Sequence, residues 1–314
     1  MQSEIDFDAT RIGETFGPIE LLPDEKTVRE FCDERGDHNP IYLDSSPFGG
    51  PVVPPAFRAS LQGQRTLATK YDMHATVPTK SRHDYLNPAR VGKRLITTGK
   101  LTGKYLKRGL EYIIIDSFTV DEDGVEIRRS REHILLGLKN RHGNITKGSE
   151  ESVGSYQFDE IAEPGERSKV GHPDDSLVGG EIPPLTKEAY QSSLHTQDFL
   201  EDSIHDDDYA KSRGYAGPLV SAYVLNEYLS EMLVNFFGPG WLQGGSISLV
   251  FVKPGVQEGN IITCRGIIAK VVKRDADIRL NLDIWIETGA GVKVVMGSAS
   301  GVAESEATIV QRLK

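Results

Sequence analysis

Apolar residues in the C-terminal part of the chain follow first a helical and then a strand-like spacing. Six of them recur every three or four positions, which predicts a helix with one wide buried face: Leu225, Tyr228, Leu229, Met232, Leu233 and Phe236. The sequence Gly238-Pro239-Gly240 then ends this helix. The segments that follow, "GSISLVFVKP", "GNIITCRGIIAKVV", "DIRLNLDIWIET" and "VKVVMGSASGVAE", alternate or run apolar between turn residues and are typical of strands.

The N-terminal part carries a diverged copy of the same pattern. "YLNPARVGKRLITTGKLTGKYLKRG" matches "FVKPGVQEGNIITCRGIIAKVVKRD", with Gly99 against Gly266. Further on, Gly124 matches Gly291 in two predicted hairpin turns that need glycine at positive φ. We therefore predict an internal duplication, in which each half is a helix wrapped by an antiparallel sheet. Joining the two sheets edge to edge would remove one exposed edge from each half.

The stretch between the two copies differs in composition from both. Residues 140–184 contain few large apolar side chains and many Gly, Ser and Pro residues. A connection of this length is typical of a linker. The sequence thus predicts an N-terminal domain over residues 1–139, a linker over 140–184 and a C-terminal domain over 185–314.

Charge and composition exclude several classes of function. The net charge is −10, which argues against binding to nucleic acid or to an anionic membrane. The two cysteines, Cys32 and Cys264, lie far apart and lack metal-binding spacing, so no metal is expected. We see neither a signal peptide nor an apolar run of about 18 residues, and we expect a soluble cytoplasmic protein. Nucleotide-binding and serine-hydrolase motifs are also absent from the sequence, and no cofactor is predicted.

Two short motifs resemble a known family. "GDHNPIYLD", Gly36 to Asp44, and "SIHDDDYAKSRGYAGP", Ser203 to Pro218, resemble motifs of the MaoC-like hydratase/dehydratase family. The resemblance covers nearly the whole chain outside the linker. It implies an α+β fold, a double hot-dog in which a long central helix is wrapped by an antiparallel sheet in each half. Such double hot-dogs can pair further as homodimers.

The family resemblance also implies a reaction. Members add water reversibly to a 2-enoyl thioester of CoA or acyl carrier protein, giving the 3-hydroxyacyl thioester of fatty acid metabolism. In the family an Asp and a His five residues later hold and activate the water. A His can exchange a proton near neutral pH, and a carboxylate can orient water. The substrate itself is then the only implied partner, and no cofactor is needed.

The two copies match the catalytic pattern differently. The first has Asp37 and carries Tyr42 where the family has His, while the second has His205 and carries Leu200 where the family has Asp. An unperturbed Tyr has a pKa near 10 and is a poor base at neutral pH. We therefore predict that His205 is the general acid/base and that Asp202 orients it. Asp37 remains a further catalytic candidate.

The resemblance assigns substrate contacts to both halves. Backbone amides around Gly217, Ser221 and Ala222 would polarise the thioester carbonyl at the start of the central helix. Asn39 and Tyr42 of the first copy would line part of the acyl pocket. Two alternatives stay open: a hot-dog thioesterase that uses Glu227, and an acyl-thioester-binding protein without catalytic activity.

Overall fold

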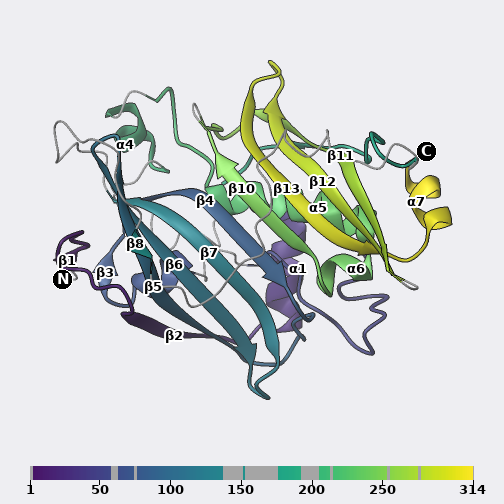
Figure 1. Cartoon of the computed structure of the whole chain (residues 1–314), viewed down its shortest axis with the longest axis horizontal. Helices are drawn as coiled ribbons and strands as arrows, with labels where there is room; N and C mark the ends of the chain where they lie inside the picture. The colour runs from purple at the N-terminus through teal and green to yellow at the C-terminus, as the bar shows by residue number, and fades with distance from the viewer. Residues whose placement is uncertain are drawn as a thin grey trace.

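The computed structural model describes residues 3–57, 63–73, 76–136, 151–152, 176–191, 205–212, 215–252, 255–274 and 277–313. In this part of the chain one long antiparallel sheet runs through the whole molecule (Figure 1). Its strands are, in spatial order, β2 (Thr15–Leu21), β5 (Leu95–Lys107), β6 (Leu110–Asp121), β7 (Glu126–Leu136), β4 (Thr76–Tyr85), β10 (Ser246–Phe251), β13 (Lys293–Ala303), β12 (Asp277–Thr288), β11 (Ile261–Arg274) and β9 (Leu185–Glu188). The short strand β8 (Glu151–Ser152) pairs with β5, and β1 (Ser3–Glu4) pairs with β3 (Tyr71–Asp72).

The two halves meet where β4 pairs with β10. The pairing is antiparallel and places Ser246 opposite Asp84 and Val250 opposite Lys80. At the end of β4, the Tyr85 amide also donates to the carbonyl of Gly245, the residue just before β10, at 2.8 Å. This pairing confirms that the sheets of the two halves join edge to edge, so that neither presents this edge to solvent.

The backbone hydrogen bonds confirm the duplication. In the first half Val52 forms an isolated bridge with Arg90, and in the second half Leu219 forms the same bridge with Gln257. The four residues stand at one constant spacing between the copies. The predicted hairpin glycines, Gly124 and Gly291, both have the positive φ that was expected, 80° and 76°.

Strand irregularities repeat in the same way. The ladder between β5 and β6 shifts register between Leu101 and Gly103, and the ladder between β11 and β12 shifts between Ile268 and Lys270. These positions correspond in the repeat. A β-bulge bends and twists a strand locally, so both sheets curve at the same place.

The long helix of the second half, α5 (Ala222–Phe237), is the predicted central helix. The Ser221 hydroxyl caps its N-terminus by accepting from the Tyr223 amide at 3.2 Å. Fourteen of its residues are buried, so it is covered on nearly all sides rather than on one face. A shorter helix, α1 (Glu25–Arg35), lies beside it behind the sheet (Figure 1). Among the described residues, the second half also contains the helices α4 (Asp207–Ser212), α6 (Pro239–Leu242) and α7 (Glu306–Arg312).

In the first half the structure describes α2 (Gly63–Leu67) at the place of the expected central helix. Residues 58–62, directly before it, lie outside the described residues. The buried hydrophobic residues form two separate clusters. Leu67 of α2 belongs to the smaller one, and α5 belongs to the larger one, together with side chains of α1.

Part of the expected linker packs along the second half. The Gly179 amide donates to the Ile268 carbonyl, and the Ile182 amide donates to the Gly266 carbonyl at 3.0 Å. The Ile182 side chain is fully buried. The stretch 176–182 therefore extends the edge of β11, while residues 140–150 and 153–175 lie outside the described part. The two predicted boundaries, after residues 139 and 184, stay a prediction.

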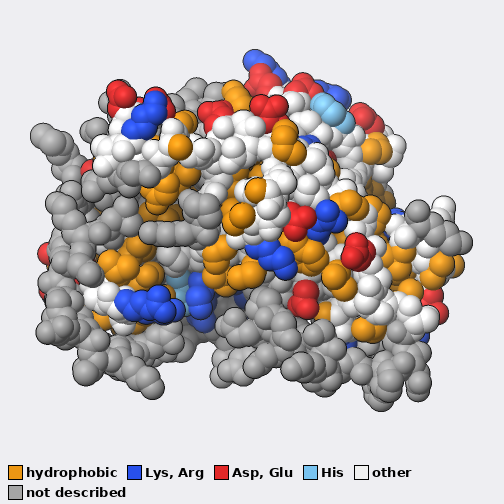
Figure 2. Space-filling model, turned by 90° about the horizontal axis from the view of Figure 1, so that it is seen from above, with side chains coloured by type: hydrophobic (Ala, Val, Ile, Leu, Met, Phe, Trp, Pro, Cys, Tyr) orange, Lys and Arg blue, Asp and Glu red, His pale blue; other side chains and the backbone are white. Residues whose placement is uncertain are grey.

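The described surface carries charges of both signs. On the face shown in Figure 2, hydrophobic side chains form several separate patches, and acidic and basic side chains are interspersed among them. Searched over the described residues, the helices include none with the length and apolar character that a membrane span requires.

Candidate active site

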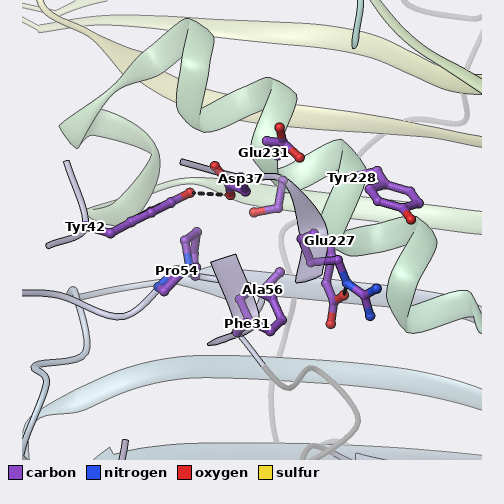
Figure 3. A pocket seen from close by; sticks show the side chains of 11 residues that line it. Phe31, Asp37, Tyr42, Pro54, Ala56, Glu227, Tyr228 and Glu231 are labelled. Carbon is purple, nitrogen blue, oxygen red and sulfur yellow. Dashed lines mark hydrogen bonds and ion pairs between the residues drawn. The ribbon is translucent and has the colours of Figure 1, made fainter. Parts of the chain in front are cut away.

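The first motif begins where α1 ends. Gly36 adopts a left-handed conformation with φ 61°, which caps α1 and turns the chain toward Asp37. The Asn39 side chain accepts from the Ile41 amide at 3.0 Å and fixes the next turn. Tyr42 then points back, and its hydroxyl donates to Asp37 Oδ2 at 3.1 Å (Figure 3). Both side chains are buried.

Two acidic residues of α5 face this motif. Glu227 accepts from Arg35 Nε at 2.5 Å, and Glu231 forms an ion pair with Lys187 Nζ at 2.8 Å. Lys187 also donates to the Arg35 carbonyl at 2.7 Å, at the C-terminus of α1. Arg35, Glu227 and Glu231 line a small pocket together with Asp37 and Tyr42 (Figure 3). The first motif and the central helix of the second half thus build one polar cluster.

Burial dominates the electrostatics of this cluster. It raises the pKa of Asp37, against the hydrogen bond from Tyr42. It also raises the pKa of Glu231 to about 7, with a further rise from Asp37 and an opposing effect of Lys187. The pKa of Tyr42 is raised well above its ordinary value by burial and then by Asp37. Tyr42 therefore keeps its proton at neutral pH and acts as a hydrogen-bond donor, not as a base.

His205 lies in a different environment. Its Nδ1 is 2.6 Å from the Leu219 carbonyl, and because a carbonyl can only accept, Nδ1 carries the proton. In the neutral ring Nε2 is then the basic nitrogen. Asp202, the expected orienting carboxylate, lies outside the described residues. The Leu219 carbonyl thus helps to orient the His205 ring.

The two motifs contact opposite ends of α5. Asn39 Nδ2 donates to Asn235 Oδ1 at 2.8 Å near the C-terminus of the helix. His205 contacts Leu219, just before the N-cap residue Ser221. At 1.5 Å per residue, Ser221 and Asn235 are on the order of 20 Å apart along the helix axis. The structure therefore brings Asp37, Asn39 and Tyr42 together beside the middle and the C-terminal part of α5, whereas His205 lies before its N-terminus.

The start of α5 carries the predicted carbonyl-binding segment. Gly217 is buried, and Ser221 and Ala222 follow at the N-terminus of the helix. The Ser221 amide donates to Gln191 Oε1 at 2.7 Å. This amide thus already binds a carbonyl oxygen, which belongs to a side chain of the protein itself.

Sequence reasoning missed three charged members of the buried cluster, Arg35, Lys187 and Glu231. Arg35 directly precedes the first motif, and Glu231 follows Glu227 by one helical turn, so both had a local signal. Lys187 stands in β9 and has no such signal, because only the fold brings it to the end of α1.

Comparisons with known proteins concern the family and the fold. Residues 10–130 match the family described as "FAS1-like, dehydratase domain region". Among curated proteins, none matches the sequence.

Several solved structures share the fold over nearly the whole chain. A putative MaoC domain protein dehydratase from Chloroflexus aurantiacus is 13% identical with a TM-score of 0.69, and the match covers 96% of this chain and 98% of that one. A Mycobacterium tuberculosis protein described as having a double hotdog fold is 14% identical with a TM-score of 0.68, over 96% and 98% of the two chains. The Drosophila melanogaster peroxisomal multifunctional enzyme type 2 is 12% identical with a TM-score of 0.61, over 92% of this chain and 48% of that one.

The chain therefore has the double hot-dog fold, which it shares with solved structures described as MaoC-like dehydratases, and its residues 10–130 match a dehydratase-domain family.

Proposed function

We propose that this protein is a hydro-lyase that hydrates a 2-enoyl thioester and dehydrates the 3-hydroxyacyl thioester, with His205 as the general acid/base. The observation that carries the proposal is the hydrogen bond from His205 Nδ1 to the Leu219 carbonyl. It leaves Nε2 as the base, immediately before the N-terminus of the buried helix α5. The match of residues 10–130 to a dehydratase-domain family supports the same class of reaction.

The reaction follows from these groups. Nε2 of His205 removes a proton from water while the water oxygen bonds to C3 of the enoyl group. The electron pair of the C2–C3 double bond moves toward the thioester oxygen, where amides at the start of α5 would stabilise the negative charge. The proton then passes to C2, which completes the addition of water. Dehydration is the reverse of these steps.

Asp202 would orient His205 or the water, as the family pattern implies, and Asp37 is the catalytic candidate of the other copy. Asn39 and Tyr42 would shape the wall of the acyl pocket from the first half. The substrate would be carried by CoA or acyl carrier protein in the cytoplasm, and the double hot-dog would work alone or as a homodimer. The thioesterase alternative is weakened, because Glu227 is ion-paired with Arg35 and buried, so it is poorly placed to activate water.

Loss of the enoyl-thioester absorbance on hydration tests the proposal, across substrates of varied length and branching. We expect His205→Ala to lower kcat by about 10²–10⁴-fold, the usual contribution of a positioned acid/base. Asp37→Asn is the matched variant in the other copy and should keep kcat within about twofold. Full activity of His205→Ala would refute the proposal. Ligand-induced stabilisation by an acyl-CoA, without turnover of any substrate, would instead favour the binding-protein alternative.

A further inference from the structure

A surface groove adjoins the segment that holds His205. The groove measures about 490 Å³ and lies between Tyr215 and Ala216, which precede α5, the start of β11 and the hairpin that joins β12 to β13. Gln257 lines it and pairs with Leu219 through a backbone bridge, and the Leu219 carbonyl accepts from His205. The groove therefore starts next to the proposed reaction centre.

The lining of the groove is uncharged and mixed. Gln257, Asn260 and Thr288 contribute amide and hydroxyl groups, and Ile261 and Val292 contribute apolar side chains that are 51% and 46% exposed. Among the described residues that line it, none carries a charge. The groove thus suits a ligand that is itself uncharged and combines hydrogen-bonding groups with apolar ones.

The first half provides an internal comparison at the same place. Its turns are the same as those of the second half: the Asp121 amide donates to the Val125 carbonyl, as the Thr288 amide donates to the Val292 carbonyl, both at 3.0 Å. Six lining positions of the groove correspond to charged residues of the first half. Each charged residue of the first half stands 167 positions before its groove counterpart: Arg90 corresponds to Gln257, Lys93 to Asn260, Arg94 to Ile261, Asp121 to Thr288, Glu122 to Gly289, and Asp123 to Ala290.

In the first half these charges pair with one another and with their surroundings. Lys93 forms ion pairs with Asp121 and Asp123, and Arg94 forms one with Glu20 at 2.9 Å. In such a surface the charged side chains pair with one another, and no uncharged hydrogen-bonding groups are presented to a ligand at these positions. The duplicated fold therefore carries an ion-paired surface in one copy and an uncharged groove in the other, and the uncharged copy is the one with His205.

We propose that this groove binds the pantetheine arm of the acyl thioester, the uncharged chain with two amides that CoA and acyl carrier protein share. The inference rests on the proposed function. The phosphates of CoA would need cationic side chains, which the groove lacks among its described residues. A purely hydrocarbon acyl chain would offer no hydrogen bonds to the side-chain amide of Gln257 or to the hydroxyl of Thr288, at a cost in free energy. The amides of pantetheine supply those partners.

Exchanging residues between the copies tests the groove. The double variant Asn260→Lys/Ile261→Arg installs the side chains of the first half, and the matched control Lys93→Asn/Arg94→Ile makes the reverse change there. The probe is pantetheine itself, titrated into His205→Ala protein and followed by NMR, so that binding is measured without turnover. We expect the groove variant to weaken binding by about tenfold or more and the control to leave it within about twofold.

A second variant, Ala290→Asp, adds a carboxylate at an exposed turn position and should weaken binding in the same direction. Thermal unfolding of each variant verifies that it is folded. Equal affinity of the wild-type groove and the groove variants for pantetheine would overturn the proposal. So would a groove effect that grows with acyl chain length in N-acetylcysteamine thioesters, since that result would assign the groove to the acyl chain.

The outcome is separable from that of the proposed function. Groove-dependent binding of pantetheine without turnover of any enoyl thioester would support the groove and refute the hydro-lyase. Turnover that depends on His205, with KM for an enoyl-pantetheine unchanged in the groove variants, would support the hydro-lyase and refute the groove.

Discussion

Arg35 and Glu227 form an ion pair between α1 of the first half and α5 of the second, with Nε and Oε2 2.5 Å apart. Their side chains are only 2% and 3% exposed, so neither charge is solvated by bulk water. A buried charge that loses its partner is costly, whereas exchanging both partners for apolar residues can be neutral. The ion pair is therefore a specific link between the halves and a sensitive point of the fold.

Arg35→Ala should lower the free energy of unfolding by about 3–5 kcal/mol, because Glu227 would stay buried without its partner. Urea denaturation measures this change. The control is Lys26→Ala, which breaks an ion pair whose side chains are 84% and 51% exposed, and its effect should stay within about 0.5 kcal/mol. The double variant Arg35→Met/Glu227→Leu should recover most of the loss. An Arg35→Ala protein as stable as the wild type would contradict this account.

Tyr42→Phe should separate structure from catalysis. Removing the hydroxyl leaves the buried Asp37 with one hydrogen bond fewer, and we expect a loss of about 1–3 kcal/mol in unfolding free energy. The kcat for hydration should change little, because Tyr42 lies beside the middle of α5, whereas His205 contacts Leu219 before the helix begins. Tyr190→Phe, at a side chain that is 48% exposed, is the control. A large fall in kcat with unchanged stability would move the chemistry to the first copy.

The sheet and the duplication could be predicted because their signals are local. Gly124 and Gly291 mark the same hairpin turn in the two copies, and both have the expected positive φ. The apolar spacing from Leu225 to Phe236 likewise predicted a helix, which α5 confirms. Turn glycines and apolar periods need no knowledge of distant residues, so a single sequence contains them.

The arrangement of the site could not be read in the same way. Asn39 and Asn235 form a hydrogen bond although they are 196 residues apart, and no local pattern connects them. The role of Tyr42 as a donor to Asp37 also depends on burial, which sets both pKa shifts. Sequence spacing identified the residues, but their distribution along α5 follows only from the packing of the two halves. The catalytic roles of His205, Asp202 and Asp37 stay predictions.

Glu231 should make stability depend on pH. Its folded pKa of about 7 lies above the ordinary value of 4.5, so between these values the folded state binds more protons than the unfolded state. Stability from this group is then fully present below about pH 4.5 and is lost as the pH rises toward 7. The raised pKa of Asp37 makes stability fall with rising pH in the same way. The positive charge of Lys187 opposes the rise of both pKa values.

The difference in unfolding free energy between wild type and Glu231→Gln isolates this group. Wild type should lose stability relative to the variant between about pH 4.5 and 7, and the difference should level off above pH 7. Urea denaturation in buffers of constant ionic strength measures it. A difference that stays constant from pH 4.5 to 8 would show that the folded pKa of Glu231 is not raised.

Gln191 should compete with the substrate. Its Oε1 accepts from the Ser221 amide at 2.7 Å, at the helix end where the thioester carbonyl is proposed to bind. A substrate carbonyl that takes this amide must first displace the side chain. A hydrogen bond of this kind contributes about 0.5–1.5 kcal/mol, so Gln191→Ala should lower KM for an enoyl thioester by about two- to tenfold and leave kcat nearly unchanged. Steady-state kinetics with the absorbance assay provides both constants.

Gln191→Glu is the matched variant, because it keeps the size of the side chain and adds a negative charge. A carboxylate binds amides at a helix N-terminus more strongly than a neutral carbonyl does, so this variant should raise KM. Opposite changes in KM for the two variants would identify the Ser221 amide as a substrate contact. If Gln191→Ala instead raises KM, the side chain helps to bind the substrate. If neither variant changes KM, the thioester carbonyl binds elsewhere, and the role of the α5 N-terminus in the reaction would have to be given up.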